Sequence, residues 1–146
     1  MINRILALDV GNRRIGLALS DPVTGHIAQP LFTLHRTTLR ADLKSIARVL
    51  RKHGVTDIVV GNPLHMSGDQ SPQAVKAQAF TAELRAFLPP PLPVFHLWDE
   101  RLTSWEAHLL LDEAGHPRGP GRRAIIDQVA AVLILEAFLE SRAHQP

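Results

Sequence analysis

The sequence of 146 residues contains no cysteine, no tyrosine and only 5% aromatic residues. The lack of cysteine excludes disulfides and thiolate metal sites, and it fits a reducing compartment. The only apolar stretch near the N-terminus is a short strand-like run that Asp9 interrupts, and no stretch approaches the length needed to cross a membrane. We therefore expect a cytoplasmic protein that does not contact a membrane.

Charges of the two signs are nearly balanced. The 16 Lys and Arg residues exceed the 14 Asp and Glu residues by a net charge of +2, which does not by itself identify a nucleic-acid-binding protein. Cationic residues recur at every fourth position along one predicted helix and so form a stripe: Arg36, Arg40, Lys44, Arg48 and Lys52. This stripe is either an ordinary solvated helix face or a track for phosphates.

The chain length fits a single domain over residues 1–146, and no internal repeat divides it. Short apolar runs rich in β-branched residues predict five strands, at 4–9, 15–20, 31–35, 56–61 and 94–99. Apolar periodicity and capping signals predict four helices, at about 38–53, 71–88, 103–114 and 126–142. The first two strands would form an antiparallel hairpin, and the later alternation predicts a mixed sheet flanked by helices.

Asp9 is the most informative residue of the chain, because it ends the first apolar run. An ionised carboxylate at the end of a core strand loses solvation unless a cation or several donors lie beside it. Arg13 and Arg14 in the following turn are candidate partners, and so is a metal ion.

Further acids point to the same place. Asp99 and Glu100 end the strand at 94–99, and if this strand runs parallel to the first, its acids reach the sheet edge where open α/β sheets bind ligands. Asp127 opens the predicted last helix at the end of an apolar stripe, so its side chain points towards the sheet.

Three acids at one edge repel one another unless multivalent cations lie between them, and oxygen ligands favour Mg²⁺ or Mn²⁺. Structural roles stay open at this point: the helix dipole for Asp127, a loop ion pair for Glu100 and an arginine pair for Asp9.

Four segments, in chain order, have a recognisable pattern: DVGNRRIGLALSDP at 9–22, GNPLHMSGDQS at 61–71, WDERLTS at 98–104 and IDQVAAVLIL at 126–135. Together they span nearly the whole chain and resemble the motifs of the YqgF/RuvX family. Members of that family are ribonuclease-H-like proteins described as Holliday junction resolvases or pre-16S ribosomal RNA nucleases. The chain departs from the family at Asn62, where leucine is usual, and has Arg122 and Arg123 near a position that often holds lysine.

The resemblance implies a ribonuclease-H-like α/β fold, with a five-stranded mixed sheet of order 3-2-1-4-5 and helices on both faces. It places the catalytic and metal-binding acids at Asp9, Glu100 and Asp127, and so favours Glu100 over Asp99. The implied reaction is hydrolysis of phosphodiester bonds, in which two ions roughly 3.5–4 Å apart activate water and stabilise the leaving oxygen. Asp99 and Asp21 are further candidates for the metal shell.

Substrate contacts are expected from arginines near this edge, because guanidinium groups bind phosphate oxygens in a bidentate manner: Arg13, Arg14, Arg101, Arg122 and Arg123. The loops at 62–70 and 115–121 would shape the substrate site. The expected substrate is branched DNA or precursor rRNA, and a homodimer would suit symmetric cutting of a junction. Trp98, within a strand, is expected in the core.

Two other functions stay open from the sequence. A nucleotide-binding ATPase of the actin and sugar-kinase type also begins with an Asp-x-Gly hairpin whose turn holds phosphates, although such proteins usually have two ribonuclease-H-like halves. A non-catalytic RNA-binding or ribosome-assembly factor would keep the same acids for structural reasons.

Overall fold

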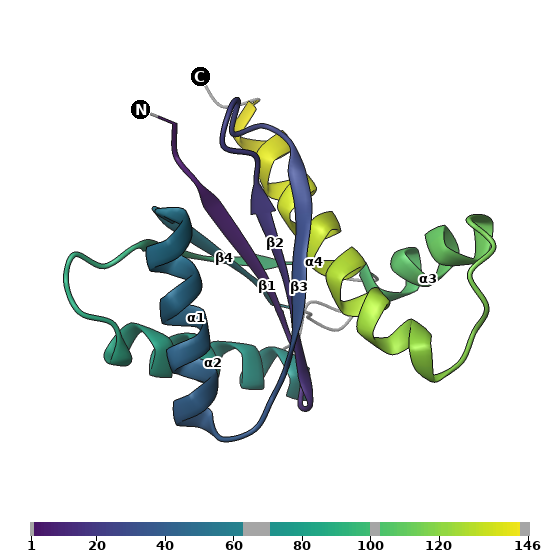
Figure 1. The fold of residues 1–146 in the computed structure, drawn as a ribbon, viewed down its shortest axis with the longest axis horizontal. Helices are drawn as coiled ribbons and strands as arrows, with labels where there is room; N and C mark the ends of the chain where they lie inside the picture. Colours follow the sequence, from purple (N-terminus) through teal and green to yellow (C-terminus); the bar gives the residue numbers. More distant parts are fainter. Residues whose placement is uncertain (1, 63–70, 100–102, 144–146) are drawn as a thin grey trace.

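The computed structural model describes residues 2–62, 71–99 and 103–143. Its strands form a five-stranded sheet of order β3-β2-β1-β4-β5 (Figure 1). They are β1 (Ile5–Val10), β2 (Arg14–Ser20), β3 (Ala28–His35), β4 (Asp57–Asn62) and β5 (Val94–Asp99). The predicted strand order is confirmed.

Strand direction brings several strand ends to one edge of the sheet. β1 pairs antiparallel with β2, and β2 pairs antiparallel with β3. β4 pairs parallel with both β1 and β5. The carboxyl ends of β1, β4 and β5 therefore lie at the same edge, with β1 in the centre of the sheet.

Helices cover both faces of this sheet. α1 (Leu39–His53) and α2 (Pro72–Phe87) lie on one face, and α4 (Pro120–Ala143) lies on the other, with α3 (Thr103–Glu113) packed beside α4 (Figure 1). Both α1 and α2 are capped at their starts: Thr38 Oγ1 accepts a hydrogen bond from Ala41 N, and Ser71 Oγ accepts one from Ala74 N. No helix among the described residues is long and apolar enough to span a membrane.

Alternation along β1 sends its side chains to two separate cores. Leu6 and Leu8 join the core under α1 and α2, whereas Ile5 and Ala7 join the core under α4. The same alternation places Asp9 on the α4 face. Trp98, also on this face, packs edge-on against Phe138 with ring centroids 5.6 Å apart, which confirms its expected place in the core.

The last helix begins six residues earlier than the sequence pattern predicted. α4 starts at Pro120 rather than at 126, because proline is well suited to the first turn of a helix, where its missing N–H has no helical partner. Asp127 consequently lies about two turns inside α4 rather than at its start. The helix dipole acts on the first turn only, so it does not explain this carboxylate.

The predicted basic stripe loses one member. Arg36 precedes α1, and its guanidinium donates to Asp42 Oδ2 and to the carbonyl oxygen of Gly11, each at 2.9 Å. The remaining four cations are exposed on α1: Arg40, Lys44, Arg48 and Lys52.

Candidate active site

The site begins at the tight turn between β1 and β2. Gly11 N donates to the carbonyl oxygen of Arg14 at 2.9 Å, which closes the turn directly after β1. A Cβ on Gly11 would lie 2.8 Å from that same oxygen, so the turn in this form requires glycine. The resulting register pairs Asp9 with Gly16, and directly opposed residues of an antiparallel pair share one face of the sheet.

Gly16 lets the backbone of α4 lie directly on the sheet. A Cβ on Gly16 would lie 1.9 Å from the carbonyl oxygen of Asp127 and 3.0 Å from its Cβ. No side chain fits in that space. Ala7 and Ala18, fully buried on the same face, keep the neighbouring positions small as well. The absence of a side chain at Gly16 thus brings Asp127, far away in sequence, beside the strand pair that carries Asp9.

The two carboxylates affect each other electrostatically. Asp9 is partly buried, and burial together with the negative charge of Asp127 raises the pKa of the Asp9 carboxyl to about 7. Both causes disfavour the ionised form. Near neutral pH this carboxyl therefore holds a proton about half of the time, unless a cation takes the place of that proton.

Arg14 compensates one of the two acids. Its Nε donates to Asp127 Oδ2 at 2.6 Å, and both side chains are largely buried. Among the described residues, neither Arg13 nor Arg14 forms an ion pair with Asp9. Arg14, one of the two partners considered for Asp9, pairs with Asp127 instead. Within the described part of the chain, the two Nη groups of Arg14 make no hydrogen bond that would compete with a phosphate.

The other predicted arginines divide into two groups. Arg13 and Arg123 are exposed, as a nucleic-acid contact requires. Arg122 is only 4% exposed, and its guanidinium donates to Asp112 Oδ1 at 2.8 Å and to the carbonyl oxygen of His116. Arg122 therefore fastens the α3–α4 connection, which corrects its expected place on a nucleic-acid surface.

Several sequence predictions fall outside the described residues. Glu100 and Arg101 are among them, and so is the part of the expected substrate-shaping loop at 63–70. Asn62, where the chain departs from the family, ends β4 and accepts a hydrogen bond from Gln78 Nε2 at 3.0 Å. This bond ties the end of β4 to α2.

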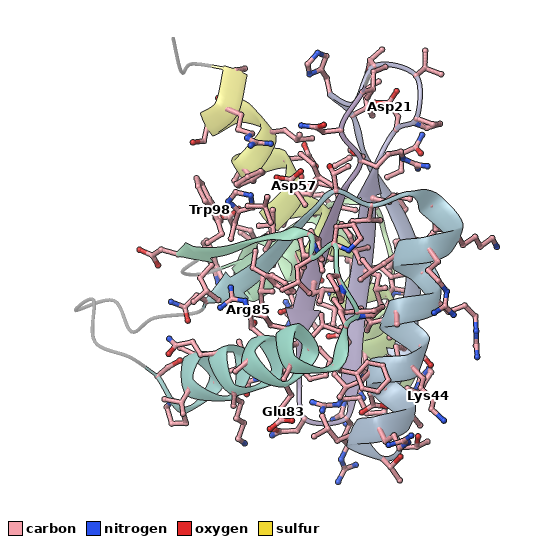
Figure 2. All side chains as sticks on the ribbon, turned by 90° about the vertical axis from the view of Figure 1, so that its left-hand side faces the viewer. Asp21, Lys44, Asp57, Glu83, Arg85 and Trp98 are labelled. Carbon is pink, nitrogen blue, oxygen red and sulfur yellow. The ribbon has the colours of Figure 1, made fainter. Side chains whose placement is uncertain are left out.

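The further acids considered for the site lie elsewhere. Asp21 follows the other end of β2, where its carboxylate accepts four backbone hydrogen bonds, including Thr24 N at 2.7 Å and Ile27 N at 2.9 Å. These bonds hold the pKa of Asp21 well below its usual value. Figure 2 shows Asp21 at the end of the molecule where the β2–β3 turn lies. Its carboxylate closes that turn.

Asp99, the last residue of β5, lies on the sheet face opposite to the one that carries Asp9. Phe95 packs in the core under α1 and α2, whereas Trp98 packs under α4. Alternation then puts Asp99 on the face opposite to Asp9. Its side chain is exposed.

Comparisons with known proteins show the family to which the chain belongs. The family model described as RuvX, Holliday junction resolvase, matches residues 3–141. The chain belongs to the RuvX family. A relative from Moorella thermoacetica is 47% identical over 137 residues, covering 94% of each chain, and carries the name "Putative pre-16S rRNA nuclease".

Solved structures show the fold of this RuvX family member. RuvC from T. thermophilus, in complex with a Holliday junction substrate, superposes with a TM-score of 0.53 at 12% identity, covering 97% of this chain and 96% of that one. The yeast mitochondrial Holliday junction resolvase Ydc2 gives a TM-score of 0.55 at 11% identity, covering 97% and 79%. The predicted ribonuclease-H-like fold, of the kind found in RuvC, is therefore confirmed.

The donor set fits a hard divalent cation. Asp9 and Asp127 supply carboxylate oxygens, which Mg²⁺ and Mn²⁺ prefer, and the pKa of Asp9 is raised first by burial and second by the negative charge of Asp127. Among the described residues no three acidic or histidine side chains gather into a metal-binding group. Asp9 and Asp127 would therefore need a third oxygen donor to hold such a cation.

The sequence reading missed Gly16. Its signal was the position of glycine inside the strand run RIGLALS, because a glycine in a strand interior often marks a close backbone approach. The sequence could not show that the backbone at Asp127 approaches Gly16, because this depends on the pairing of Gly16 with Asp9 and on the packing of α4.

Replacing Gly16 by alanine should displace α4. The added methyl collides with backbone, so we expect Gly16→Ala to lose roughly 1–3 kcal/mol of stability and Mn²⁺ affinity to fall roughly 10- to 100-fold. Urea unfolding and calorimetric titration with Mn²⁺ measure the two effects.

Ala18→Gly, on the same strand and face, is the matched control: it should cost about 1 kcal/mol and leave Mn²⁺ affinity unchanged. Parent-like Mn²⁺ binding by folded Gly16→Ala would contradict the positioning role.

Asp9 should make the metal-free protein less stable as pH rises. The pKa of Asp9 is about 7 in the folded chain against 3.8 for an ordinary aspartate. Between these values the folded state binds more protons, so stability falls until pH passes 7. Asp9→Asn abolishes this contribution, and the variant should be more stable than the parent at pH 8 by roughly 2–4 kcal/mol. At pH 4 the difference should nearly vanish. Urea unfolding in chelator at both pH values tests this, and a variant less stable than the parent at pH 8 would refute it.

Proposed function

We propose that this protein is a divalent-metal-dependent endonuclease that hydrolyses phosphodiester bonds in structured nucleic acid, either branched DNA or precursor 16S rRNA. The observation that carries the proposal is the pair Asp9 and Asp127 at the carboxyl end of the central strand. Membership of the RuvX family and the RuvC-like fold support it. The family description names a Holliday junction resolvase and the relative from Moorella thermoacetica is named a pre-16S rRNA nuclease, so the class of nucleic acid is left to experiment.

Asp9 and Asp127 are the described residues that would hold the cations. Two Mg²⁺ or Mn²⁺ ions would supply an activated water and stabilisation of the leaving oxygen. The Asp9 carboxyl, which carries a proton part of the time at neutral pH, releases it when its oxygens bind a cation. Activity should therefore rise with pH through about 7.

Arg14 is placed to act on both the acids and the substrate. Its Nε keeps Asp127 in one orientation through the 2.6 Å bond, and its Nη groups would donate to a phosphate oxygen. Arg13 and Arg123, both exposed, would add phosphate contacts, and Arg101 is proposed for the same role from its sequence position.

Glu100 is proposed as the third acid. Asp99 lies on the same face of β5 as Phe95, and the face that carries Asp9 is the opposite one, on which Trp98 packs. The resemblance to the family, rather than its placement, supports Glu100.

Because precursor rRNA and chromosomal DNA of bacterial cells are cytoplasmic, we propose the cytoplasm as the place of action. A homodimer would place two sites on a four-way junction. Light scattering of the free protein and of its junction complex would measure this stoichiometry.

Cleavage of a substrate panel tests the function. The panel holds a four-way DNA junction, a forked DNA, a hairpin RNA and a precursor-rRNA fragment, each in Mg²⁺, in Mn²⁺ and in chelator. We expect the parent to cut at least one of them only with metal. Neutralising a metal-binding acid by Asp9→Asn, Glu100→Gln or Asp127→Asn should reduce the cleavage rate roughly 100-fold or more while circular dichroism shows an intact fold.

Asp99→Asn is the matched control for Glu100→Gln, since it neutralises the neighbouring acid on the other face, and it should cleave like the parent. Full cleavage by Asp9→Asn would refute the metal site. Nucleic-acid binding without metal-dependent cleavage of any substrate would support the assembly-factor alternative, and calorimetric ATP binding would support the ATPase alternative.

A further inference from the structure

A concave region borders the β1–β2 turn on the sheet face that α1 and α2 cover, whereas the two acids lie on the α4 face. This cavity of about 720 Å³ lies between the turn, the β3–α1 junction and α2. We call it the turn pocket; its polar lining includes Asn12, Arg13, His35, Arg36, Lys76 and Glu83. Its volume is that of a ligand site, and the metal-binding acids do not line it.

Hydrogen bonds hold the walls of the turn pocket in place. Arg36 is fixed by its bonds to Asp42 and Gly11, and its guanidinium lies 5.1 Å from the ring centroid of Phe80. On the other wall, Lys76 Nζ donates to Asn12 Oδ1 at 2.9 Å. Among the described residues this is its one hydrogen bond, so two of its three donors are left for a ligand. Cationic donors from β3–α1 and from α2 thus face one cavity without further rearrangement.

The charge of the turn pocket is positive on balance. Arg13 is exposed, and within the described part of the chain no hydrogen bond or ion pair engages its guanidinium. Asp42, one of two acids in the lining, is buried, and its carboxylate accepts hydrogen bonds from Arg36 Nε and Thr37 N. Glu83 is therefore the one acid of the described lining that is exposed.

The turn connects the pocket to the candidate active site. Arg14 contributes to the lining of the turn pocket, while its side chain reaches Asp127. A nucleic-acid strand that passes the end of the turn would contact both sites. Phosphates recur along such a strand and are bound by cations that carry no sequence code, which suits cations from separate segments around an open cavity.

We propose that the turn pocket binds the sugar–phosphate backbone of the nucleic-acid substrate at nucleotides away from the cleaved bond. This inference rests on the proposed nuclease function, because it concerns the same substrate. Arg13 and Lys76 bind the phosphates, Arg36 shapes the cavity, and Glu83 opposes binding through its charge.

The experiment measures binding rather than cleavage. Fluorescence anisotropy of a labelled four-way DNA junction and of a labelled hairpin RNA is followed in chelator, over a series of salt concentrations. The variants are Arg13→Gln, Lys76→Gln and Glu83→Gln, with Lys44→Gln as the control. Lys44 is exposed on the outer side of α1, away from the turn pocket, and is labelled together with Glu83 in Figure 2.

Loss of one phosphate contact should lower affinity roughly 5- to 10-fold near 0.1 M salt. We expect this loss for Arg13→Gln and Lys76→Gln, with a salt slope smaller by about 1. Lys76→Arg should restore affinity, which a purely structural role of the lysine would not require. Glu83→Gln should tighten binding, roughly twofold, and Lys44→Gln should bind like the parent.

Two results would overturn the inference: parent-like binding by Arg13→Gln and Lys76→Gln, or an equal loss in Lys44→Gln, which would indicate a general charge effect. Displacement of the labelled RNA by a poly-glutamate peptide of equal charge would also overturn it, in favour of an acidic protein ligand. Because binding is measured without metal, pocket-dependent binding by a protein that cleaves nothing would refute only the nuclease proposal. Metal-dependent cleavage with parent-like binding by the pocket variants would refute only the turn pocket.

Discussion

The contact between the backbone of α4 and Gly16 determines the rest of the candidate site. A Cβ at this position would lie 1.9 Å from the carbonyl oxygen of Asp127, so the two segments meet at a distance that only glycine permits. Because Gly16 is the antiparallel partner of Asp9, the contact brings two carboxylates together from positions 118 residues apart. Small buried residues at Ala7, Ala18 and Ala131 continue this close packing along α4.

Bringing these acids together has an electrostatic cost that the protein compensates only in part. Arg14 pairs with Asp127, but burial of Asp9, and second to it the charge of Asp127, still raises the pKa of the Asp9 carboxyl to about 7. The fold tolerates this cost because extensive apolar cores lie on both faces of the sheet. Such a local conflict, held in place by the surrounding packing, is typical of functional sites. A bound cation would relieve it.

The same turn organises both proposed binding regions. Arg14 is directed to the acids, while Asn12 and Arg13 border the turn pocket. Closure of the turn by the Gly11–Arg14 bond therefore fixes the side that carries the two acids relative to the cationic side. A substrate held at both would be positioned by contacts on each side of the turn, with the chemistry confined to one.

Much of this was predictable from local sequence patterns. The apolar runs located the strands, and the apolar stripe after Asp127 showed that this residue faces the sheet. The start of α4 was not predictable from apolar periodicity, because its first turn is polar and begins with Pro120. The buried position of Arg122 was not predictable either, because its bonds to Asp112 and His116 depend on how α3 and α4 pack. The role of Gly16 required the sheet register, and the turn pocket required the placement of β3, α1 and α2 around the turn, which no local pattern encodes.

The central claim is that Asp9 and Asp127 form an acidic pair that a divalent cation neutralises. Calorimetric titration with Mn²⁺ at several pH values, each in two buffers of different ionisation enthalpy, tests it most directly. The account predicts binding that strengthens up to pH of about 7 and releases up to one proton per protein below that value, with little release at higher pH. It also predicts loss of binding in Asp127→Asn. Binding of Mn²⁺ without proton release at pH 6, or unchanged in Asp127→Asn, would contradict it.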